Sequence, residues 1–405
     1  MPRPLKIALL AHSTNPRGGV VHALELGDAL AGLGHMVTVH APDPAGRGFF
    51  RETRCRTRSV AATTLAPGAS VTEMVRRRAG DYVAHFEDAA NRGFDVYHAQ
   101  DGISANALAT LKERGVIPAF ARTVHHVDAF ADPALQRLQL RAITAADELF
   151  VVSDTWRDLL ARDFGRAADN VGNGVDRARF SARPDESDRP LRDRLGLAGA
   201  AGPVLLAIGG IEARKNTLQI LEAFLLVRAR RPEARLVIAG GASLLDHDAY
   251  RAAFLERLAA TGLPEGTVIV TGPLRQGEMP ALYRLADVLL FPSVKEGFGL
   301  VVLEAMAAGV PVVTSAIPPF TEYLGERDVA WCDPACSASI AAATMSALAP
   351  EIRRVLVAGG DGVAAQHGWW RTARAHLGAY HRLAGLAPCP PHIPRLGAEP
   401  EHLDA

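Results

Sequence analysis

The stretch over residues 291–315 constrains this chain most, and it reads FPSVKEGFGLVVLEAMAAGVPVVTS. It opens on the end of an apolar strand over residues 288–291 and continues into a turn rich in glycine. A helix is predicted over residues 300–308, because Gly309 stands where a helix C-cap belongs and a proline follows soon after. The next strand is predicted over residues 312–315. A strand, a turn, a helix and a strand in this order build a parallel sheet, so the stretch predicts an α/β fold.

The start of this helix is a candidate anion site. Its first N–H groups, near Phe298, Gly299, Leu300 and Val301, have no partner within the helix. They also carry the positive end of the helix dipole, which attracts a phosphate group.

Two glutamates in this stretch, Glu296 and Glu304, have the spacing E-x7-E. Glu304 lies one turn inside the helix among apolar residues, and a charge in such surroundings needs a partner. A vicinal diol such as that of a ribose would suit Glu304, because both hydroxyls can donate to one carboxylate. The alternative is an ordinary buried strand–helix unit with Glu296 on the surface.

The motif EGFGLVVLEAMAAGVPVV resembles that of the retaining glycosyltransferases of family 4, which have the GT-B fold. The resemblance implies two doubly wound, Rossmann-like domains that face each other across a cleft. It also implies that Glu304 holds the ribose of a nucleotide sugar and that Glu296 meets the donor sugar. The backbone amides from Phe298 to Val301 would then contact the sugar and the diphosphate.

Composition limits the domain count and the partners. The 405 residues suit two domains of ordinary size. Lysine plus arginine and aspartate plus glutamate both number 44, so charge gives no argument for a nucleic-acid partner. The four scattered cysteines predict free thiols in a reducing cytoplasm, and we see no apolar run of membrane-spanning length. The sequence does not indicate an oligomeric state.

Residues 1–180 alternate between apolar strands and helices, which predicts a doubly wound N-terminal domain. The resemblance implies that this domain lies on the acceptor side. In such a sheet the functional groups lie at the carboxyl ends of the strands. Ser153 follows a strand over residues 148–152 and is predicted to cap the helix over residues 154–163.

Two motifs of this domain resemble parts of the family's donor site. Gly18 and Gly19 open the first helix without forming the dinucleotide-binding fingerprint, and the resemblance places them under the donor sugar and phosphate. A Gly-Gly pair that only makes the turn is the alternative. His125 belongs to T-V-H-H at the end of a strand, and the resemblance implies that it lines the donor sugar site. A hydrogen-bonded structural histidine is the alternative, and we favour that interpretation for His126.

Two basic segments of the N-terminal domain admit different partners. The irregular stretch over residues 42–68 is basic, which favours an anionic acceptor; a solvated loop or hairpin is the alternative. A helix predicted over residues 71–92 carries three adjacent arginines, which allow weak peripheral contact with the inner face of a membrane; a solvated helix face is the alternative. The arginines are Arg47, Arg51, Arg54, Arg56 and Arg58 in the first segment, and Arg76, Arg77 and Arg78 in the second.

The rest of the chain divides into four segments. Residues 181–202 are polar and then rich in glycine and alanine, which predicts a linker. Residues 203–365 form the predicted C-terminal Rossmann-like domain, and the resemblance implies that it binds the nucleotide sugar. A helix over residues 366–387, continuing a helical stretch from residue 351, is expected to cross back to the N-terminal domain. Residues 388–405 form a polar, proline-rich tail.

The segment GGIEARKN, residues 209–216, resembles the part of the family that holds the donor diphosphate with an arginine and a lysine. Lys215 matches the lysine, whereas Gly210 stands at the position of the arginine. Arg214 is the candidate to supply the missing charge. Leu274 follows a later strand, in the loop that cradles the base in the family.

The charge distribution favours transfer without a metal. A leaving diphosphate needs a positive field, and some transferases supply it with a metal held by Asp-x-Asp. Asp246 and Asp248 have that spacing but lie in the connection before a helix. Lys215, Arg214 and the helix N-terminus can supply the field instead. We therefore predict no metal and no cofactor, with a UDP- or GDP-sugar as the donor.

The resemblance thus implies a retaining glycosyltransferase, with His125, Glu296 and Lys215 as its catalytic residues. The sequence does not name the acceptor, and a hydroxyl of a glycan, a lipid or a small metabolite is expected. A sugar-nucleotide epimerase of the same fold is the main alternative. A Rossmann oxidoreductase is less favoured because the glycine fingerprint is missing. A binding protein without activity is disfavoured because Lys215, Glu296 and Glu304 are all present.

Overall fold

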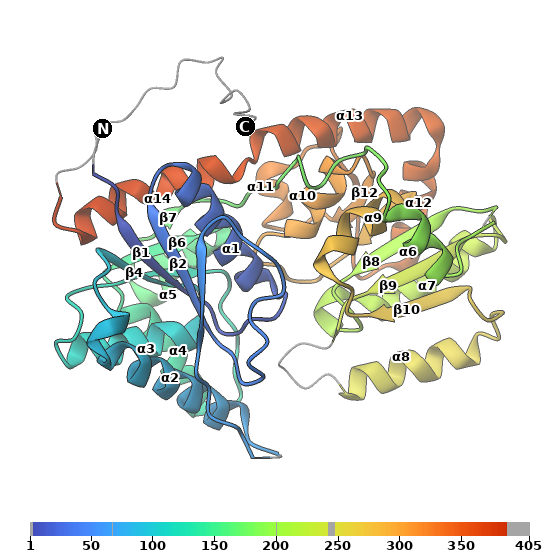
Figure 1. The fold of residues 1–405 in the computed structure, drawn as a ribbon. Helices are drawn as coiled ribbons and strands as arrows, with labels where there is room; N and C mark the ends of the chain where they lie inside the picture. The colour runs from blue at the N-terminus through green and yellow to red at the C-terminus, as the bar shows by residue number, and fades with distance from the viewer. Residues whose placement is uncertain (1–2, 67, 200, 242–247, 387–405) are drawn as a thin grey trace.

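The computed structural model describes residues 3–66, 68–199, 201–241 and 248–386. The described chain forms two domains, each built on a parallel β-sheet with helices on both faces (Figure 1). The predicted fold class is confirmed: two Rossmann-like domains lie side by side, as in GT-B proteins.

In the described part of the chain, the first sheet has seven strands in the order β3-β2-β1-β4-β5-β6-β7. All of its strand pairs are parallel, with Ile7 opposite Val37 on one side and Val96 on the other. The strands are β1 (Lys6–Leu10), β2 (Met36–Pro42), β3 (Arg56–Val60), β4 (Val96–Ala99), β5 (Ala121–Val124), β6 (Glu148–Val151) and β7 (Asp169–Asn170).

Strand β1 shows how this sheet is buried on both faces. Ile7 and Leu9 belong to a cluster of buried apolar side chains that also holds Leu24 of helix α1. Ala8 and Leu10 point the other way, into a cluster that holds Tyr82 of helix α2. Side chains alternate along a strand, so a continuous apolar run is required when both faces are covered. The helices of this domain are α1 (Gly18–Gly32), α2 (Val71–Glu87), α3 (Gly102–Glu113), α4 (Pro133–Thr144) and α5 (Asp154–Phe164).

The second sheet has six strands within the described residues, in the order β10-β9-β8-β11-β12-β13. Its strands are β8 (Val204–Ile208), β9 (Arg235–Ala239), β10 (Val268–Gly272), β11 (Val288–Phe291), β12 (Val312–Ser315) and β13 (Ala330–Cys332). Its helices are α7 (Thr217–Arg228), α8 (Asp248–Ala260), α9 (Met279–Arg284), α10 (Leu300–Ala307), α11 (Phe320–Tyr323) and α12 (Ser337–Leu348). Strands β8 and β11 are neighbours, so the segments that follow them emerge at the same edge of the sheet.

Two long helices at the end of the described chain connect the domains. Helix α13 (Pro350–Gln366) packs on α10 of the second domain, and α14 (Trp369–Leu383) packs on α1 of the first (Figure 1). The helical stretch expected from residue 351 onward is divided into two helices by a break at residues 367–368. The carbonyl of His367 accepts from the N–H of Val175 at 2.7 Å, instead of continuing the helical pattern.

The structure differs from several predicted bounds of strands, helices and loops. Residues 42–68 are not wholly irregular, because β3 pairs with β2; β3 lies at the sheet edge and is exposed except at Val60, so it lacks an apolar pattern. The helix predicted over residues 71–92 ends at Glu87. The segment predicted as a linker contains helix α6 (Asp188–Arg194), which the Arg284 guanidinium ties to the second domain through Asp188 at 3.0 Å. The proline-rich tail lies outside the described residues.

Candidate active site at the domain interface

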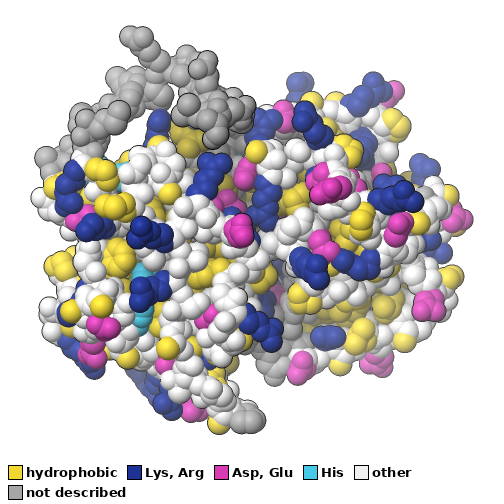
Figure 2. All heavy atoms as spheres, in the orientation of Figure 1, with side chains coloured by type: hydrophobic (Ala, Val, Ile, Leu, Met, Phe, Trp, Pro, Cys, Tyr) yellow, Lys and Arg dark blue, Asp and Glu magenta, His cyan; other side chains and the backbone are white. Residues whose placement is uncertain are grey.

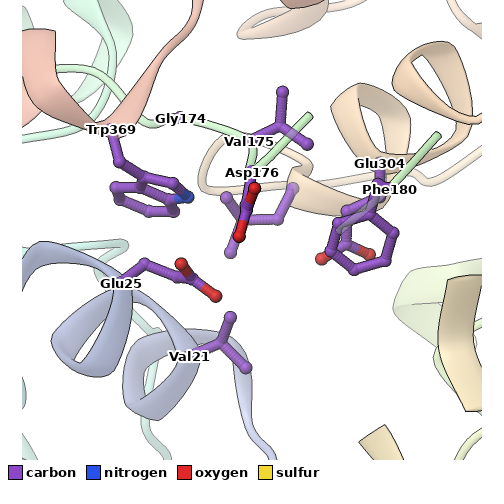
Figure 3. Close-up of a pocket in the computed structure, with 9 residues that line it drawn as sticks. Val21, Glu25, Gly174, Val175, Asp176, Phe180, Glu304 and Trp369 are labelled. Atoms are coloured by element: carbon purple, nitrogen blue, oxygen red, sulfur yellow. The ribbon is translucent and has the colours of Figure 1, made fainter. Parts of the chain in front are cut away.

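Two helix N-termini meet where the domains face each other. Val21 and Glu25 lie one turn apart near the start of α1, and Leu300 and Glu304 lie one turn apart on α10. All four border one small cavity, together with the segment Gly174–Phe180 that leaves the first domain (Figure 3). The first N–H groups of both helices lack partners within their helix, so the interface is favourable for an anion.

A three-residue ion cluster lies beside the start of α10. Both Arg214 Nη1 and Lys215 Nζ donate to Glu296 Oε1 at 2.6 Å. The Glu296 and Lys215 side chains are only 8% and 12% exposed, whereas that of Arg214 is 43% exposed. The cluster forms because β8 and β11 are adjacent, so the loops after them converge. The structure thus brings together three of the predicted donor-site residues.

Charge balance in this cluster favours the ionised glutamate. Burial acts to raise the pKa of Glu296, but the charges of Lys215 and Arg214 outweigh it and hold the pKa below its ordinary value. Burial lowers the pKa of Lys215, although the charge of Glu296 opposes this. The Lys215 ammonium also lies 4.2 Å from the centre of the Phe291 ring, a cation–π contact that holds it in place.

The structure explains why no arginine stands at position 210. Gly210 has φ of +77°, and a Cβ built on it would lie 2.8 Å from the carbonyl oxygen of Gly241. A side chain there would be strained and would collide with backbone. A second positive charge does lie beside Lys215, because Arg214 Nη1 is 2.6 Å from the same oxygen of Glu296.

Glu304 has a partner that the sequence did not indicate. Tyr283 Oη donates to Glu304 Oε2 at 2.6 Å. Burial raises the pKa of Glu304, and the Tyr283 hydrogen bond and the charge of Arg179 only oppose this in part. The side chain is half-buried and borders the interface cavity, so it remains available to a ligand on that side (Figure 3).

His125 faces this site from the first domain. Its Nε2 lies 3.3 Å from Gln100 Oε1, which as an acceptor selects the tautomer with a proton on Nε2. Burial lowers the pKa of His125 well below its ordinary value, and neighbouring His22, 4.7 Å away between ring centres, adds to the shift. The ring is therefore neutral at pH 7. A Cβ built on Gly19 would lie 3.6 Å from His125 Cδ2, so the Gly-Gly start of α1 and this ring are neighbours.

The other predicted site residues lie at the starts of α1 and α10 and in nearby loops. Gly18 and Gly19 are the first residues of α1, and Gly299 is the N-cap of α10. The Phe298 ring stacks on Tyr323 with ring centres 4.6 Å apart, so only its backbone is available to a ligand. Leu274 follows β10 at its carboxyl end and is half-buried. The His126 side chain is exposed, and its Nε2 lies 3.2 Å from Asp128 Oδ2. It therefore pairs with Asp128 and not with His125.

Glu25 is a site residue that we did not predict. It is a buried carboxylate on α1, with Oε1 3.0 Å from Arg51 Nη2 and 3.4 Å from Arg179 Nη1. Burial raises the pKa of Glu25 to about 7, even though both arginines act to lower it. The signal was present in the sequence, because Glu25 stands in an apolar helical run just as Glu304 does. Gln100 carried a different signal, because it follows a strand at its carboxyl end, whereas Tyr283 carried none.

The basic segments are less charged at the surface than the sequence indicated. Arg51 pairs with Glu25 and Asp28, and Arg78 is buried against Asp81 at 2.9 Å. The expected surface cluster of three arginines on α2 is therefore wrong, since only Arg76 and Arg77 are exposed. Figure 2 shows basic and acidic side chains interspersed over one face of the molecule.

Searches for other kinds of site concern the described residues only. Within them, no group of three histidine, cysteine, aspartate or glutamate side chains is arranged to hold a metal ion. No helix among them has both the length and the apolar character needed to cross a membrane. Asp246 of the Asp-x-Asp pair lies outside the described residues, and Asp248 begins α8.

Comparison with known families covers most of the chain. Residues 197–356 match the model of glycosyl transferases group 1. Residues 17–174 match the model of a glycosyl transferase 4-like domain. The two matches fall on the second and the first domain described above.

Individual proteins agree with these families. The chain is 30% identical to a GDP-mannose-dependent α-(1-6)-phosphatidylinositol monomannoside mannosyltransferase of Mycolicibacterium smegmatis, over 73% of this chain and 76% of that protein. It is 29% identical to D-inositol 3-phosphate glycosyltransferase 2 of Catenulispora acidiphila, over 94% of this chain and 95% of that protein. The solved structure of sucrose-phosphate synthase from Thermosynechococcus elongatus superposes with a TM-score of 0.75 at 22% identity, covering 95% of this chain and all of that one. These relatives favour glycosyl transfer over the epimerase and oxidoreductase alternatives.

Proposed function

This chain belongs to the glycosyl transferases group 1 family and is a glycosyltransferase that uses a nucleotide sugar, and on that premise we propose the details of its reaction. We propose that it moves a hexosyl group from a UDP- or GDP-sugar to an acceptor hydroxyl, with retention of configuration and without a metal. The observation that carries this proposal is the ion cluster of Lys215, Arg214 and Glu296 beside the N-terminus of α10.

The reaction breaks the bond between the anomeric carbon and the diphosphate oxygen and forms one to the acceptor oxygen. Negative charge grows on the leaving diphosphate, and in this proposal the Lys215 ammonium, the Arg214 guanidinium and the α10 N–H groups stabilise it. The leaving phosphate oxygen takes the proton of the acceptor hydroxyl. Glu304 accepts hydrogen bonds from the ribose, and neutral His125 lines the sugar side of the site.

We propose a GDP- or UDP-linked hexose as the donor and an acceptor that bears an anionic group. The first named relative uses GDP-mannose, and the second acts on an inositol phosphate. In this chain Arg56 and Arg58 are exposed on β3, and Arg47 and Arg54 are exposed in the segment before it. A positive surface of this kind attracts an anionic substrate, more strongly at low ionic strength.

We also propose that the protein works in the cytoplasm and makes at most weak contact with an anionic membrane. Arg76 and Arg77 on α2 support such a contact, since each exposed basic residue near a charged bilayer contributes about 1 kcal/mol. Sedimentation with vesicles that contain anionic lipid, with Arg76→Ala/Arg77→Ala as comparison, tests it. Equal recovery of both proteins in the supernatant would rule it out.

The function is tested first by donor binding and then by the product. A thermal-shift screen against UDP-, GDP- and ADP-sugars identifies the base, because a bound ligand raises the apparent stability. With the identified donor, NMR of the product is expected to show the anomeric configuration of the donor and release of the nucleoside diphosphate. An altered sugar that stays attached to the nucleotide would instead indicate an epimerase.

Metal independence has its own test. We expect the rate in excess EDTA to equal the rate with added magnesium or manganese, because fixed cations and helix N–H groups replace the metal. The apo enzyme treated with EDTA and then supplied with metal is the control. Complete loss in EDTA that metal restores would refute this part of the proposal.

A further inference from the structure

The turn that carries Glu296 is held by a tryptophan of the other domain. Trp156, on α5 of the first domain, donates its indole Nε1–H to the carbonyl oxygen of Gly297 at 3.1 Å. The Trp156 side chain is buried, and it belongs to the same apolar cluster as Phe298. Gly297 is adjacent to Glu296 in the sequence, so this hydrogen bond acts on the backbone that positions the glutamate.

A second contact runs in the opposite direction across the interface. Lys295 Nζ, just before Glu296, donates to the carbonyl oxygen of Val127 at 2.9 Å and lies 5.5 Å from the centre of the Trp156 ring. The backbone at Gly297 packs closely against the backbone at His125, because a Cβ on Gly297 would lie 2.4 Å from the carbonyl oxygen of His125. The turn with Glu296 and the loop with His125 are therefore in direct contact.

Helix α5 itself is capped from the second domain. Ser153 occupies the N-cap position, but its hydroxyl has no hydrogen-bond partner among the described residues, so the predicted Ser153 cap is wrong. Glu322 of α11 takes that role: its two carboxylate oxygens accept from Asp154 N at 2.7 Å and from Thr155 N at 2.9 Å. A carboxylate at a helix N-terminus is favoured both as a hydrogen-bond acceptor and by the helix dipole.

These contacts form one connected path from Glu322 through the first turn of α5 and Trp156 to the turn with Glu296. We propose that Trp156 is a positioning residue for the transfer reaction: its indole N–H fixes the Glu296 turn against the His125 loop when the domains are together, and Glu322 holds Trp156 in place. The path touches the sugar end of the site and not Glu304, which lies further along α10. This inference rests on the proposed function, because it assigns Glu296 to the donor sugar.

The test uses Trp156→Phe, which removes the N–H and retains an aromatic ring. We expect kcat/KM for the donor to fall about threefold to tenfold, the usual result of losing one hydrogen bond. The affinity for the free nucleoside diphosphate, measured by calorimetry, is expected to stay unchanged because Lys215 and Glu304 are untouched. Trp370→Phe is the matched control, since Trp370 is 44% exposed on α14. Wild-type kinetics in Trp156→Phe, or an equal loss of nucleoside diphosphate affinity, would overturn the proposal.

The connected path is tested with Glu322→Ala and the double variant. If both residues act through the placement of α5, the fold-decrease in kcat/KM of the double variant is smaller than the product of the two single fold-decreases. Fully multiplicative losses would show two separate contacts and would contradict the path.

A measurement without substrate separates this inference from the proposed function. Hydrogen exchange of the backbone amides over residues 294–299 is expected to speed up in Trp156→Phe and in Glu322→Ala, but not in Trp370→Phe. Faster exchange with no turnover of any nucleotide sugar, even by the wild type, would refute the function and leave the contact path supported. Unchanged exchange in Trp156→Phe would refute the path itself.

Discussion

At the scale of single residues, the proposed donor site contains a glutamate, Glu296, that is shared by two cations. One of its oxygens accepts from both Arg214 and Lys215, so the two cations lie side by side at the start of α10. The lowered pKa of Glu296 keeps this carboxylate ionised near neutral pH, so the cluster holds one negative and two positive charges. The cluster therefore keeps a net positive charge beside the N-terminus of α10, where the diphosphate is proposed to bind.

Removing either cation is expected to weaken donor binding unequally. Lys215→Ala removes a buried ammonium, so we expect a loss of about tenfold to hundredfold in nucleoside diphosphate affinity, as for hydrogen bonds to charged groups. Arg214→Ala is expected to cost less, because this side chain is 43% exposed and water screens it. Calorimetry measures both, with exposed Arg231→Ala as control. An Arg214→Ala variant that binds every donor like wild type would show that Arg214 does not replace the arginine missing at Gly210.

The two glutamates are expected to divide the donor between them. Glu304→Ala removes the group assigned to the ribose, so both the free nucleoside diphosphate and the intact donor should bind about tenfold to hundredfold more weakly. Glu296→Ala should leave the free nucleoside diphosphate nearly unaffected, while donor binding and turnover fall. Calorimetry on both variants decides this. A loss confined to Glu296→Ala, or equal losses in the two, would overturn the assignment.

At the scale of elements, helix α14 stabilises the domain that begins the chain. It packs on α1, and the Tyr380 hydroxyl lies 2.7 Å from His98 Nδ1 in the middle of the first sheet. Both side chains are buried, so the first domain is complete only when the last described helix is in place.

Tyr380→Phe tests how much this contact contributes. The variant keeps the ring and leaves His98 Nδ1 without its nearest partner, and a buried polar group without its partner costs about 1–3 kcal/mol. Chemical denaturation is expected to show a free energy of unfolding lower by that amount. Trp370→Phe on the exposed side of the same helix should change it little. Equal stability of Tyr380→Phe and wild type would mean that the hydrogen bond adds nothing beyond packing.

At the scale of the whole molecule, charged contacts tie the two domains together. Arg179 donates to the carbonyl oxygen of Gln276 in the second domain at 2.9 Å and lies 3.4 Å from Glu25 in the first. Glu25 in turn borders the cavity that Glu304 borders from the other side (Figure 3). The interface thus contains a carboxylate that titrates near neutral pH.

Glu25 is expected to make stability depend on pH. Burial raises its pKa from 4.5 to about 7 on folding, so the folded state favours the protonated form. The stabilisation is fully present below about pH 4.5 and is lost as the pH rises through about 7, by up to about 3 kcal/mol. Thermal unfolding at pH 5 and pH 8 should therefore show a larger decrease in Tm for wild type than for Glu25→Gln. Parallel changes in the two proteins would mean that Glu25 does not titrate in this range.

The sequence alone determined the alternation of elements and the site on α10. Residues 288–315 are consecutive, so the strand, the turn, the helix N-terminus and the spacing of Glu296 and Glu304 follow from local pattern. The same holds for Gly18 and Gly19 at the start of α1. The exposed edge strand β3 was missed because it buries only one residue, Val60, and so has no apolar alternation.

Only the tertiary structure decided which distant residues meet. Lys215 reaches Glu296 because β8 pairs with β11, and Tyr283 reaches Glu304 because α9 packs beside α10. Trp156 and Glu322 meet the other domain through contacts that no local pattern encodes. Strand and helix formation depends on neighbours along the chain, whereas sheet order and domain contact depend on long-range packing, which a single sequence does not display.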